Sequence, residues 1–169
     1  YSIVGLTKRM SLCICSDLRS EPKVIEARLQ IEATALTMLL PKFTGGKRLE
    51  VFVATSDNSV FVVDGISGVV ENQLLQSRFA SPIIRLAIAP NGRFVACYTS
   101  SGLLTVMSSS FTTKVLDFDT ATNVPPSQML WCGEDSVILN WPGFLLMVGP
   151  FGHWLKFQYS HIEPRVLIP

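Results

Sequence analysis

Short runs of alternating hydrophobic and polar residues, separated by turn residues, recur along this chain with a period of about 45 residues. The clearest copy consists of residues 83–89, 93–99, 103–108 and 114–118. The turns Pro90-Asn91-Gly92 and Ser100-Ser101-Gly102 follow its first two runs, and glycine supplies the positive φ angles that tight hairpins need. Alternation with a period of two is typical of β-strands. The pattern therefore predicts an all-β chain of four-stranded antiparallel units, the blades of a β-propeller.

The repeat extends over the whole chain. Complete blades are predicted at residues 35–75, 83–118 and 128–159. Residues 2–29 supply three strands of a blade whose first strand is missing, and residues 165–169 would open another blade. Propellers usually have four to eight blades, so the roughly three and a half blades predicted here cannot close a ring. We expect residues 1–169 to form part of one larger propeller domain, of seven blades, in a longer protein.

Residues 25–40 fit a helix as well as strands, because five apolar residues share one helical stripe. They are Ile25, Leu29, Ala33, Leu36 and Leu40. Proline lies on both sides of the segment, at Pro22 and Pro41, and the neighbouring runs have strand periodicity. Two strands with a link near Glu32 are therefore favoured, and the helix stays open as the alternative.

The composition is that of a packed protein with little charge. Of the 169 residues, 48% are hydrophobic and 16% are charged, which is enough to bury the core of one domain. The formal net charge is +1, and the aromatic residues do not interleave with basic ones. No apolar run reaches the roughly 18 residues of a membrane-spanning helix. We therefore expect neither nucleic acid as a partner nor a direct transmembrane segment.

Cysteine and histidine are the first candidates for site chemistry. These residues are Cys13, Cys15, Cys97, Cys132, His153 and His161. Cys13 and Cys15 alternate along one predicted strand, the other cysteines lie in separate units, and no CxxC pair occurs. A zinc site needs about four converging ligands at characteristic spacings. We therefore expect no metal site and interpret the cysteines as buried thiols of a cytosolic protein.

The predicted inner strands, which would line the channel of a propeller, carry almost no catalytic groups. Residues 35–40, 83–89 and 128–132 contain one charged side chain, Arg85. Acidic residues lie instead at predicted turns or strand ends, where they cap hairpins: Asp57, Asp64, Asp117, Asp119, Glu134 and Asp135. No glycine-rich loop leads from a strand into a helix, as a phosphate site would require. The sequence thus predicts no catalytic, cofactor-binding or metal-binding residue, and no cofactor.

One stretch has a more specific signature. It runs Pro125-Pro126-Ser127-Gln128-Met129-Leu130-Trp131-Cys132, followed by Trp141 and residues 145–150. This stretch resembles the N-terminal propeller of the vacuolar protein sorting-associated protein 16 family. Residues 89–96 with 100–106, and residues 49–54 with 62–64, are similar to the same family. The resemblance covers about residues 21–169.

The resemblance implies part of a core subunit of the HOPS and CORVET endolysosomal tethering complexes, which act in vesicle fusion and intracellular protein transport. It implies contacts with the other core subunits and a cytoplasmic location, peripheral on late endosome and vacuole or lysosome membranes. In that family a helical solenoid outside these residues carries the contact to a Sec1/Munc18-type protein. The chain is therefore expected to be a non-catalytic protein-interaction scaffold.

Seven residues are expected to support the fold at hairpins, at a crossing between blades and in the space between blades. They are Asn91, Gly92, Gly102, Pro125, Pro126, Trp131 and Trp141. Proline stiffens the crossing, and the tryptophans fill space between blades. Direct contact of these residues with a partner is the alternative. No partner-binding residue can be named from the sequence.

Two other functions stay open. The first is the propeller of another trafficking coat, a nuclear-pore protein or a WD40-like scaffold, although no Trp-Asp dipeptide ends a predicted strand. The second is a propeller hydrolase or lyase, although the predicted inner strands lack the groups that such an enzyme would need.

Overall fold

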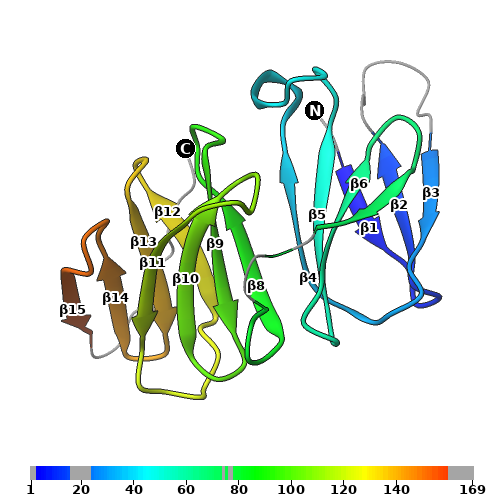
Figure 1. The fold of residues 1–169 in the computed structure, drawn as a ribbon. Helices are drawn as coiled ribbons and strands as arrows, with labels where there is room; N and C mark the ends of the chain where they lie inside the picture. The colour runs from blue at the N-terminus through cyan, green and yellow to red at the C-terminus, as the bar shows by residue number, and fades with distance from the viewer. Residues whose placement is uncertain (1–2, 16–23, 74, 76–77, 160–169) are drawn as a thin grey trace.

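The strands that the structure describes form four antiparallel sheets (Figure 1). The computed structural model describes residues 3–15, 24–73, 75 and 78–159. Each strand pairs only with strands next to it in the sequence, so every sheet is a series of hairpins. The all-β prediction is confirmed. The blade start expected at residues 165–169 lies outside the described residues, as does His161.

The first and second sheets come from the N-terminal half of the chain. The strands of the first sheet are β1 (Ile3–Leu6), β2 (Ser11–Cys15) and β3 (Val24–Arg28). Those of the second sheet are β4 (Ala33–Leu39), β5 (Glu50–Thr55), β6 (Val60–Asp64) and β7 (Val70–Asn72). The short 3-10 helix η1 (Pro41–Phe43) follows β4. Within the described ranges no helix is long and apolar enough to span a bilayer.

The third and fourth sheets have four strands each. The strands of the third sheet are β8 (Ile83–Ile88), β9 (Phe94–Thr99), β10 (Leu103–Ser108) and β11 (Lys114–Asp119). Those of the fourth sheet are β12 (Gln128–Cys132), β13 (Ser136–Trp141), β14 (Phe144–Val148) and β15 (Trp154–Gln158). We call the end of these two sheets that carries the β8–β9, β10–β11, β12–β13 and β14–β15 turns the β8–β9 end, and the opposite end the β9–β10 end.

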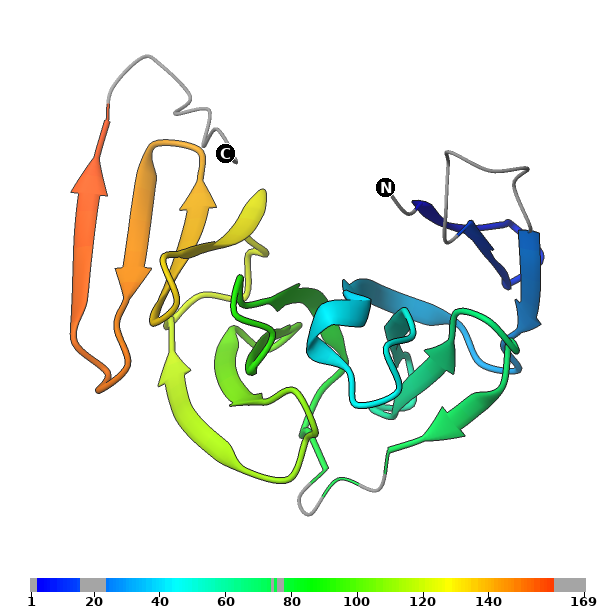
Figure 2. The same cartoon turned by 90° about the horizontal axis from the view of Figure 1, so that it is seen from above.

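Seen from above, the four sheets follow one another around an open arc, with the first strands β4, β8 and β12 on its inner side (Figure 2). Hydrogen bonds join these inner strands. The Thr34 hydroxyl donates to the Ile83 carbonyl at 2.6 Å, and the Trp131 indole donates to the Ala87 carbonyl at 2.9 Å. Consecutive blades of a propeller have this arrangement, so the prediction of a partial propeller is confirmed.

Apolar side chains pack together in each of the three spaces between neighbouring sheets. Between the first and second sheets the buried residues are Leu12, Ile14, Ala27, Leu49, Val51, Val53 and Val63. Between the second and third sheets they are Leu39, Phe52, Ala54, Val60, Ile83, Val95, Cys97, Met107 and Phe111. Between the third and fourth sheets they are Ala96, Tyr98, Leu104, Val106, Met129, Val137, Leu139, Trp141, Leu146 and Val148. Successive residues of a strand face opposite neighbours, so an inner sheet of the stack is apolar on both faces.

The helical alternative for residues 25–40 is wrong, and the favoured two strands are confirmed. β3 pairs with β2 and β4 with β5, so each segment gains interstrand hydrogen bonds. Leu36 packs towards the first sheet and Leu39 towards the third, as expected for a strand between two layers. The link contains Glu32, whose carbonyl accepts the Ser56 amide at 2.9 Å.

Most strand ends lie within one residue of the predicted ranges, and two differ by more. β4 begins at Ala33 rather than at residue 35, with a shift in register between Ala33 and Ala35 that lets Thr34 reach the third sheet. β7 ends at Asn72 rather than at residue 75. Its partner strand begins at Val60, whose carbonyl accepts the Gln73 amide at 2.8 Å, so the ladder has no partner beyond that point.

Candidate functional site

The inner strands present little reactive chemistry. Arg85 is exposed, and its guanidinium donates to the Ile84 carbonyl at 2.9 Å. Cys97 is fully buried, and burial raises the pKa of its thiol. The interpretation of the cysteines as buried thiols is confirmed for Cys97 alone. Cys13 and Cys15 are half-buried on β2, and Cys132 is exposed because it ends β12 at the β12–β13 turn. Among the described residues, no three His, Cys, Asp or Glu side chains group closely enough to hold a metal ion.

Asn91 and Gly92 lie in the β8–β9 turn, where three sheets meet. Gly92 has a φ of 70°, and its amide donates to the Ala89 carbonyl at 2.8 Å. A Cβ at Gly92 would collide with the ring of Phe43, which follows β4 in the second sheet. The Asn91 side chain donates to the Glu134 carboxylate of the fourth sheet at 3.3 Å. This turn therefore requires glycine both for its φ and for its close approach to a neighbour.

Gly102 holds the β9–β10 turn against the crossing from the third to the fourth sheet. It has a φ of 88°, and its carbonyl accepts the Thr120 hydroxyl at 2.7 Å. A Cβ there would collide with the Thr122 carbonyl. The Tyr98 hydroxyl lies 3.1 Å from the Thr120 hydroxyl, so buried β9 is tied to the same crossing.

The crossing reaches the fourth sheet next to Trp141. Pro125 is exposed and Pro126 is buried. The Trp141 indole donates to the Val124 carbonyl at 2.8 Å, and its ring stacks on Phe144 with centroids 4.9 Å apart. Trp141 is only 3% exposed. Trp131, by contrast, is half-buried, and its indole bond to Ala87 joins the inner strands of the third and fourth sheets.

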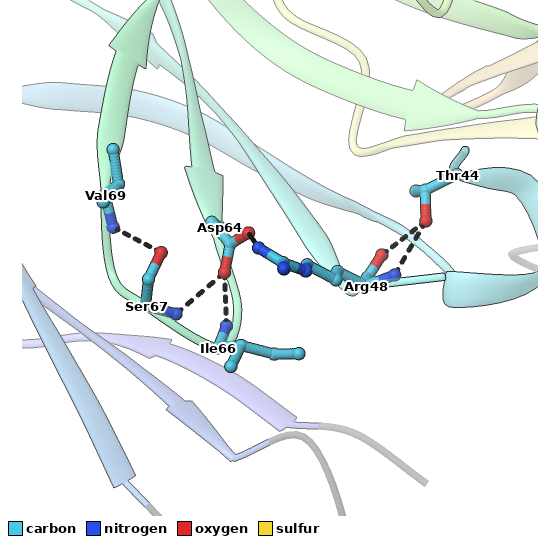
Figure 3. Close-up of polar contacts among 6 residues, drawn as sticks. All are labelled: Thr44, Arg48, Asp64, Ile66, Ser67 and Val69. Carbon is cyan, nitrogen blue, oxygen red and sulfur yellow. Dashed lines mark hydrogen bonds and ion pairs between the residues drawn. The ribbon is translucent and has the colours of Figure 1, made fainter. Parts of the chain in front are cut away.

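The acidic residues at the turns have local partners. Figure 3 shows one of them, Asp64 at the end of β6. Its carboxylate accepts the amides of Ile66 and Ser67 at 2.7 and 2.8 Å, and it forms an ion pair with Arg48 at 3.2 Å. These donors, the Ser67 amide first, lower the pKa of Asp64 to about 2. Thr44 holds Arg48 by accepting its amide and donating to its carbonyl.

Glu50 lies opposite Asp64 on the neighbouring strand, and its pKa is shifted in the opposite direction. Burial, and then the charges of Asp64 and Glu71, raise the pKa of Glu50. The carboxylates at this end of the second sheet therefore differ in proton affinity, but the bonds of Asp64 close a hairpin. The arrangement is a turn cap rather than a reactive centre.

An open apolar groove of about 90 Å³ lies at the β8–β9 end between the third and fourth sheets. Its apolar lining includes Phe94, Val106, Leu116, Trp131, Val137 and Val148. Two exposed carboxylates border it, those of Glu134 and Asp135. We call this site the β11–β15 groove, after β11, which lines it with Val115 and Leu116, and the β14–β15 turn, which lines it with Pro150.

The corresponding position between the second and third sheets is filled. Phe111, from the β10–β11 turn, is 3% exposed and meets Phe52 edge-on at a centroid distance of 5.2 Å. Phe151 lies in the corresponding β14–β15 turn but is 85% exposed. Neither phenylalanine is singled out by the repeat pattern. The one available signal is an aromatic residue inside the last turn of two successive units.

Residues 31–168 match the family described as Vps16, N-terminal region. Protein VACUOLELESS1 of Arabidopsis thaliana is 31% identical over 172 aligned positions, which cover 91% of this chain and 19% of that protein. A probable vacuolar protein sorting-associated protein 16 homolog of Schizosaccharomyces pombe is 35% identical over 94 residues, covering 54% of this chain and 11% of that protein. The chain thus spans about a fifth or less of these relatives.

Solved structures with a similar fold include one of WD40 repeats. The crystal structure of the RRP9 WD40 repeats has a TM-score of 0.60 at 15% identity, over 80% of this chain and 41% of that one. The structure of U3-55K has a TM-score of 0.62 at 14% identity, with the same coverage of both chains. At this identity the likeness supports the propeller fold alone.

Proposed function

The chain belongs to the Vps16 N-terminal region family, and on that premise we propose that it forms part of the propeller of a vacuolar protein sorting complex subunit and acts there as a non-catalytic scaffold. Family membership confirms the resemblance carried by residues 125–132. The observation that carries the proposal is the match over residues 31–168, which includes the second, third and fourth sheets.

The contacts between sheets support a scaffold role. Polar side chains between the sheets bind the backbone of a neighbouring sheet or crossing: Thr34 binds Ile83, Trp131 binds Ala87 and Trp141 binds Val124. Such bonds satisfy buried polar groups and stiffen the stack. A rigid stack of blades that offers its edges and turns to other proteins is the general use of this architecture.

In this proposal the complex is of the HOPS or CORVET type and acts in membrane tethering before fusion. The chain contacts other core subunits, and the Sec1/Munc18-type protein binds elsewhere on the full-length subunit. The subunit works at the cytoplasmic side of late endosomes and the vacuole or lysosome. Because the net charge is +1, we assign membrane attachment to other parts of the complex.

Affinity purification of the full-length protein tests this function. We expect the other core tethering subunits to copurify with it, and a full-length variant without the propeller to support endosome–vacuole fusion less well. Fusion should be measured with the variant at wild-type abundance, so that instability is not mistaken for loss of contact. Failure to recover any core subunit, together with turnover of a small-molecule or glycan substrate by the propeller, would overturn the proposal.

A further inference from the structure

We propose that the β11–β15 groove binds an extended segment of a partner protein, with one aliphatic side chain of that segment in the groove and a basic residue beside it. This inference rests on the proposed scaffold function and names one docking site for it. Its support comes from the emptiness of the groove, its size and the charge at its border.

Among the described residues, no side chain of the β14–β15 turn fills the groove. Between the second and third sheets, the β10–β11 turn inserts Phe111 next to Phe52. The β14–β15 turn has Phe151 at the corresponding place, between Pro150 and Gly152, and this ring is in solvent. An apolar surface left open beside an exposed aromatic ring is the kind of surface at which proteins bind one another.

The groove has the size of one side chain. Its volume of about 90 Å³ is some three times the ~30 Å³ share of a water molecule, and smaller than the ~150 Å³ cavity that accepts benzene. Val115 extends the apolar surface at the mouth and is 45% exposed. A leucine, isoleucine or valine side chain fits this space, whereas an aromatic ring or an acyl chain would need it to widen. Burial of one such side chain is favourable because it removes apolar area from water on both partners.

The border of the groove selects for positive charge. Glu134 and Asp135 line it, and its lining contains no basic residue. Among the described residues neither carboxylate takes part in an ion pair: Glu134 accepts from the Asn91 amide group, and Asp135 accepts from the Ser136 hydroxyl. Lys114 begins β11, whose Val115 and Leu116 line the groove, but its ammonium is paired with Asp117 at 2.7 Å. A lysine or arginine next to the inserted side chain would meet two unpaired carboxylates.

The same charge argues against a membrane as the occupant. Anionic headgroups would be repelled by Glu134 and Asp135, and the groove is too small for an acyl chain. Arg93 precedes the groove-lining Phe94 in the chain and is exposed, but it does not line the groove. A protein segment that joins an aliphatic and a basic side chain matches both features at once.

Binding of short labelled peptides to the full-length protein tests the proposal. The probe is a fluorescent nonapeptide with Lys-Leu-Lys at its centre and Gly and Ser elsewhere, measured by anisotropy. Two matched probes carry Lys-Ala-Lys and Glu-Leu-Glu. We expect the wild-type protein to bind the Lys-Leu-Lys peptide about tenfold more tightly than either matched probe.

Reversal of the border charge provides the variant. Glu134→Lys with Asp135→Lys changes exposed side chains, so the fold should persist, and the preference should change to the Glu-Leu-Glu peptide. A matched control is Glu32→Lys with Glu71→Lys, two exposed carboxylates outside the groove that give the same change in net charge. This control should bind the Lys-Leu-Lys peptide like the wild type.

Three results would overturn the proposal: no binding of the Lys-Leu-Lys peptide at about 1 mM, equal binding of the leucine and alanine probes, or no effect of the charge reversal. Recovery of core tethering subunits by the same preparation separates the two hypotheses. If those subunits copurify while the peptide fails, the groove is wrong and the scaffold function stands. If the peptide binds as expected and no subunit copurifies, the groove is a binding site, and the assignment of the chain to a tethering complex is wrong.

Discussion

The spaces on the two sides of the third sheet are built from the same repeat but closed in different ways. On the side of the second sheet, Phe111 fills the β8–β9 end and packs against Phe52. On the side of the fourth sheet, that end is open, and Trp141 closes the opposite end through the Val124 carbonyl. The interface between the second and third sheets is thus closed at the β10–β11 turn. The interface between the third and fourth sheets is closed at the crossing that joins them.

The difference between these two interfaces shows that the repeat determines where the strands lie. It does not determine which end of the space between two sheets is exposed to solvent. Phe52 and Ala96 are each the third residue of the second strand in their sheets, and both face the following sheet. The large ring at one position gives Phe111 a partner, whereas the methyl group at the other offers Phe151 little contact area.

Trp141→Ala should give the largest effect, because it removes the side chain that closes the fourth-sheet interface. We expect a loss of about 3–5 kcal/mol in the free energy of unfolding of the propeller. Trp141 loses its stack on Phe144 and its bond to Val124, and the Val124 carbonyl is left without that donor. Thermal unfolding and hydrogen exchange of the third and fourth sheets in the full-length protein measure it.

Trp154 supplies the control for that substitution. It has the same side chain in the same sheet but is 55% exposed. Trp154→Ala should therefore change the unfolding free energy by less than about 1 kcal/mol. Equal losses for the two tryptophans would show that the fourth-sheet interface is not held at the crossing.

The paired substitutions Phe111→Ala and Phe151→Ala test the comparison directly. Phe111→Ala should cost about 3 kcal/mol, because it removes a buried ring that packs edge-on against Phe52. Phe151→Ala should cost almost nothing, because its ring is in solvent. Hydrogen exchange of β5 and β10 measures the first effect, and similar costs for both would contradict the distinction between filled and open ends.

The strands could be predicted from the sequence, but the distinction between these ends could not. Alternation over residues 83–118 and the glycines at the turns are local signals, and the strands of the third sheet follow them closely. The burial of Phe111 depends on Phe52, which lies in another sheet and far earlier in the chain. No pattern within one hairpin carries that contact. The half-burial of Trp131 has the same origin, since its indole reaches Ala87 in another sheet.

Gly92→Ala should give an intermediate effect at the interface of the second and third sheets. Alanine at a φ of 70° is strained, and its Cβ would also collide with Phe43. We expect a cost of about 2 kcal/mol or more. Gly133→Ala is the matched control, because Gly133 has a φ of 65° in the β12–β13 turn and no atom closer than 3.9 Å to the added Cβ. It should cost about 1 kcal/mol, from backbone strain alone.

The difference in unfolding free energy between these two alanine variants measures the cost of the collision with Phe43. It therefore measures how tightly the β8–β9 turn packs against the second sheet. Thermal unfolding of both full-length variants under one set of conditions gives that difference. If Gly133→Ala were as costly as Gly92→Ala, the contact with Phe43 would contribute nothing, and the β8–β9 end would be no tighter towards the second sheet than towards the fourth.

Asp64 should give the smallest effect, because the β6–β7 turn uses a carboxylate where the β10–β11 turn uses an aromatic ring. The pKa of Asp64 is about 2 in the folded chain, below the ordinary value of 3.8, because the Ser67 and Ile66 amides and Arg48 favour its charged form. A carboxyl group with a lowered pKa stabilises the fold above its unfolded pKa, and this contribution falls as the pH drops from about 4 to about 2. The Arg48 ion pair is largely exposed and adds at most about 1 kcal/mol.

Denaturation of the wild type and of Asp64→Ala at pH 5 and at about pH 3 measures this contribution as a difference between the two proteins. The difference should shrink at the lower pH, because protonation removes from the wild type what the substitution removes from the variant. Arg48→Ala should keep most of the pH dependence, since the amides of Ser67 and Ile66 remain as donors. An unchanged difference between wild type and Asp64→Ala at both pH values would mean that the charge of Asp64 does not hold this turn. The β6–β7 turn would then depend on packing, as the Phe111 turn does, and the contrast between carboxylate and aromatic ring would be lost.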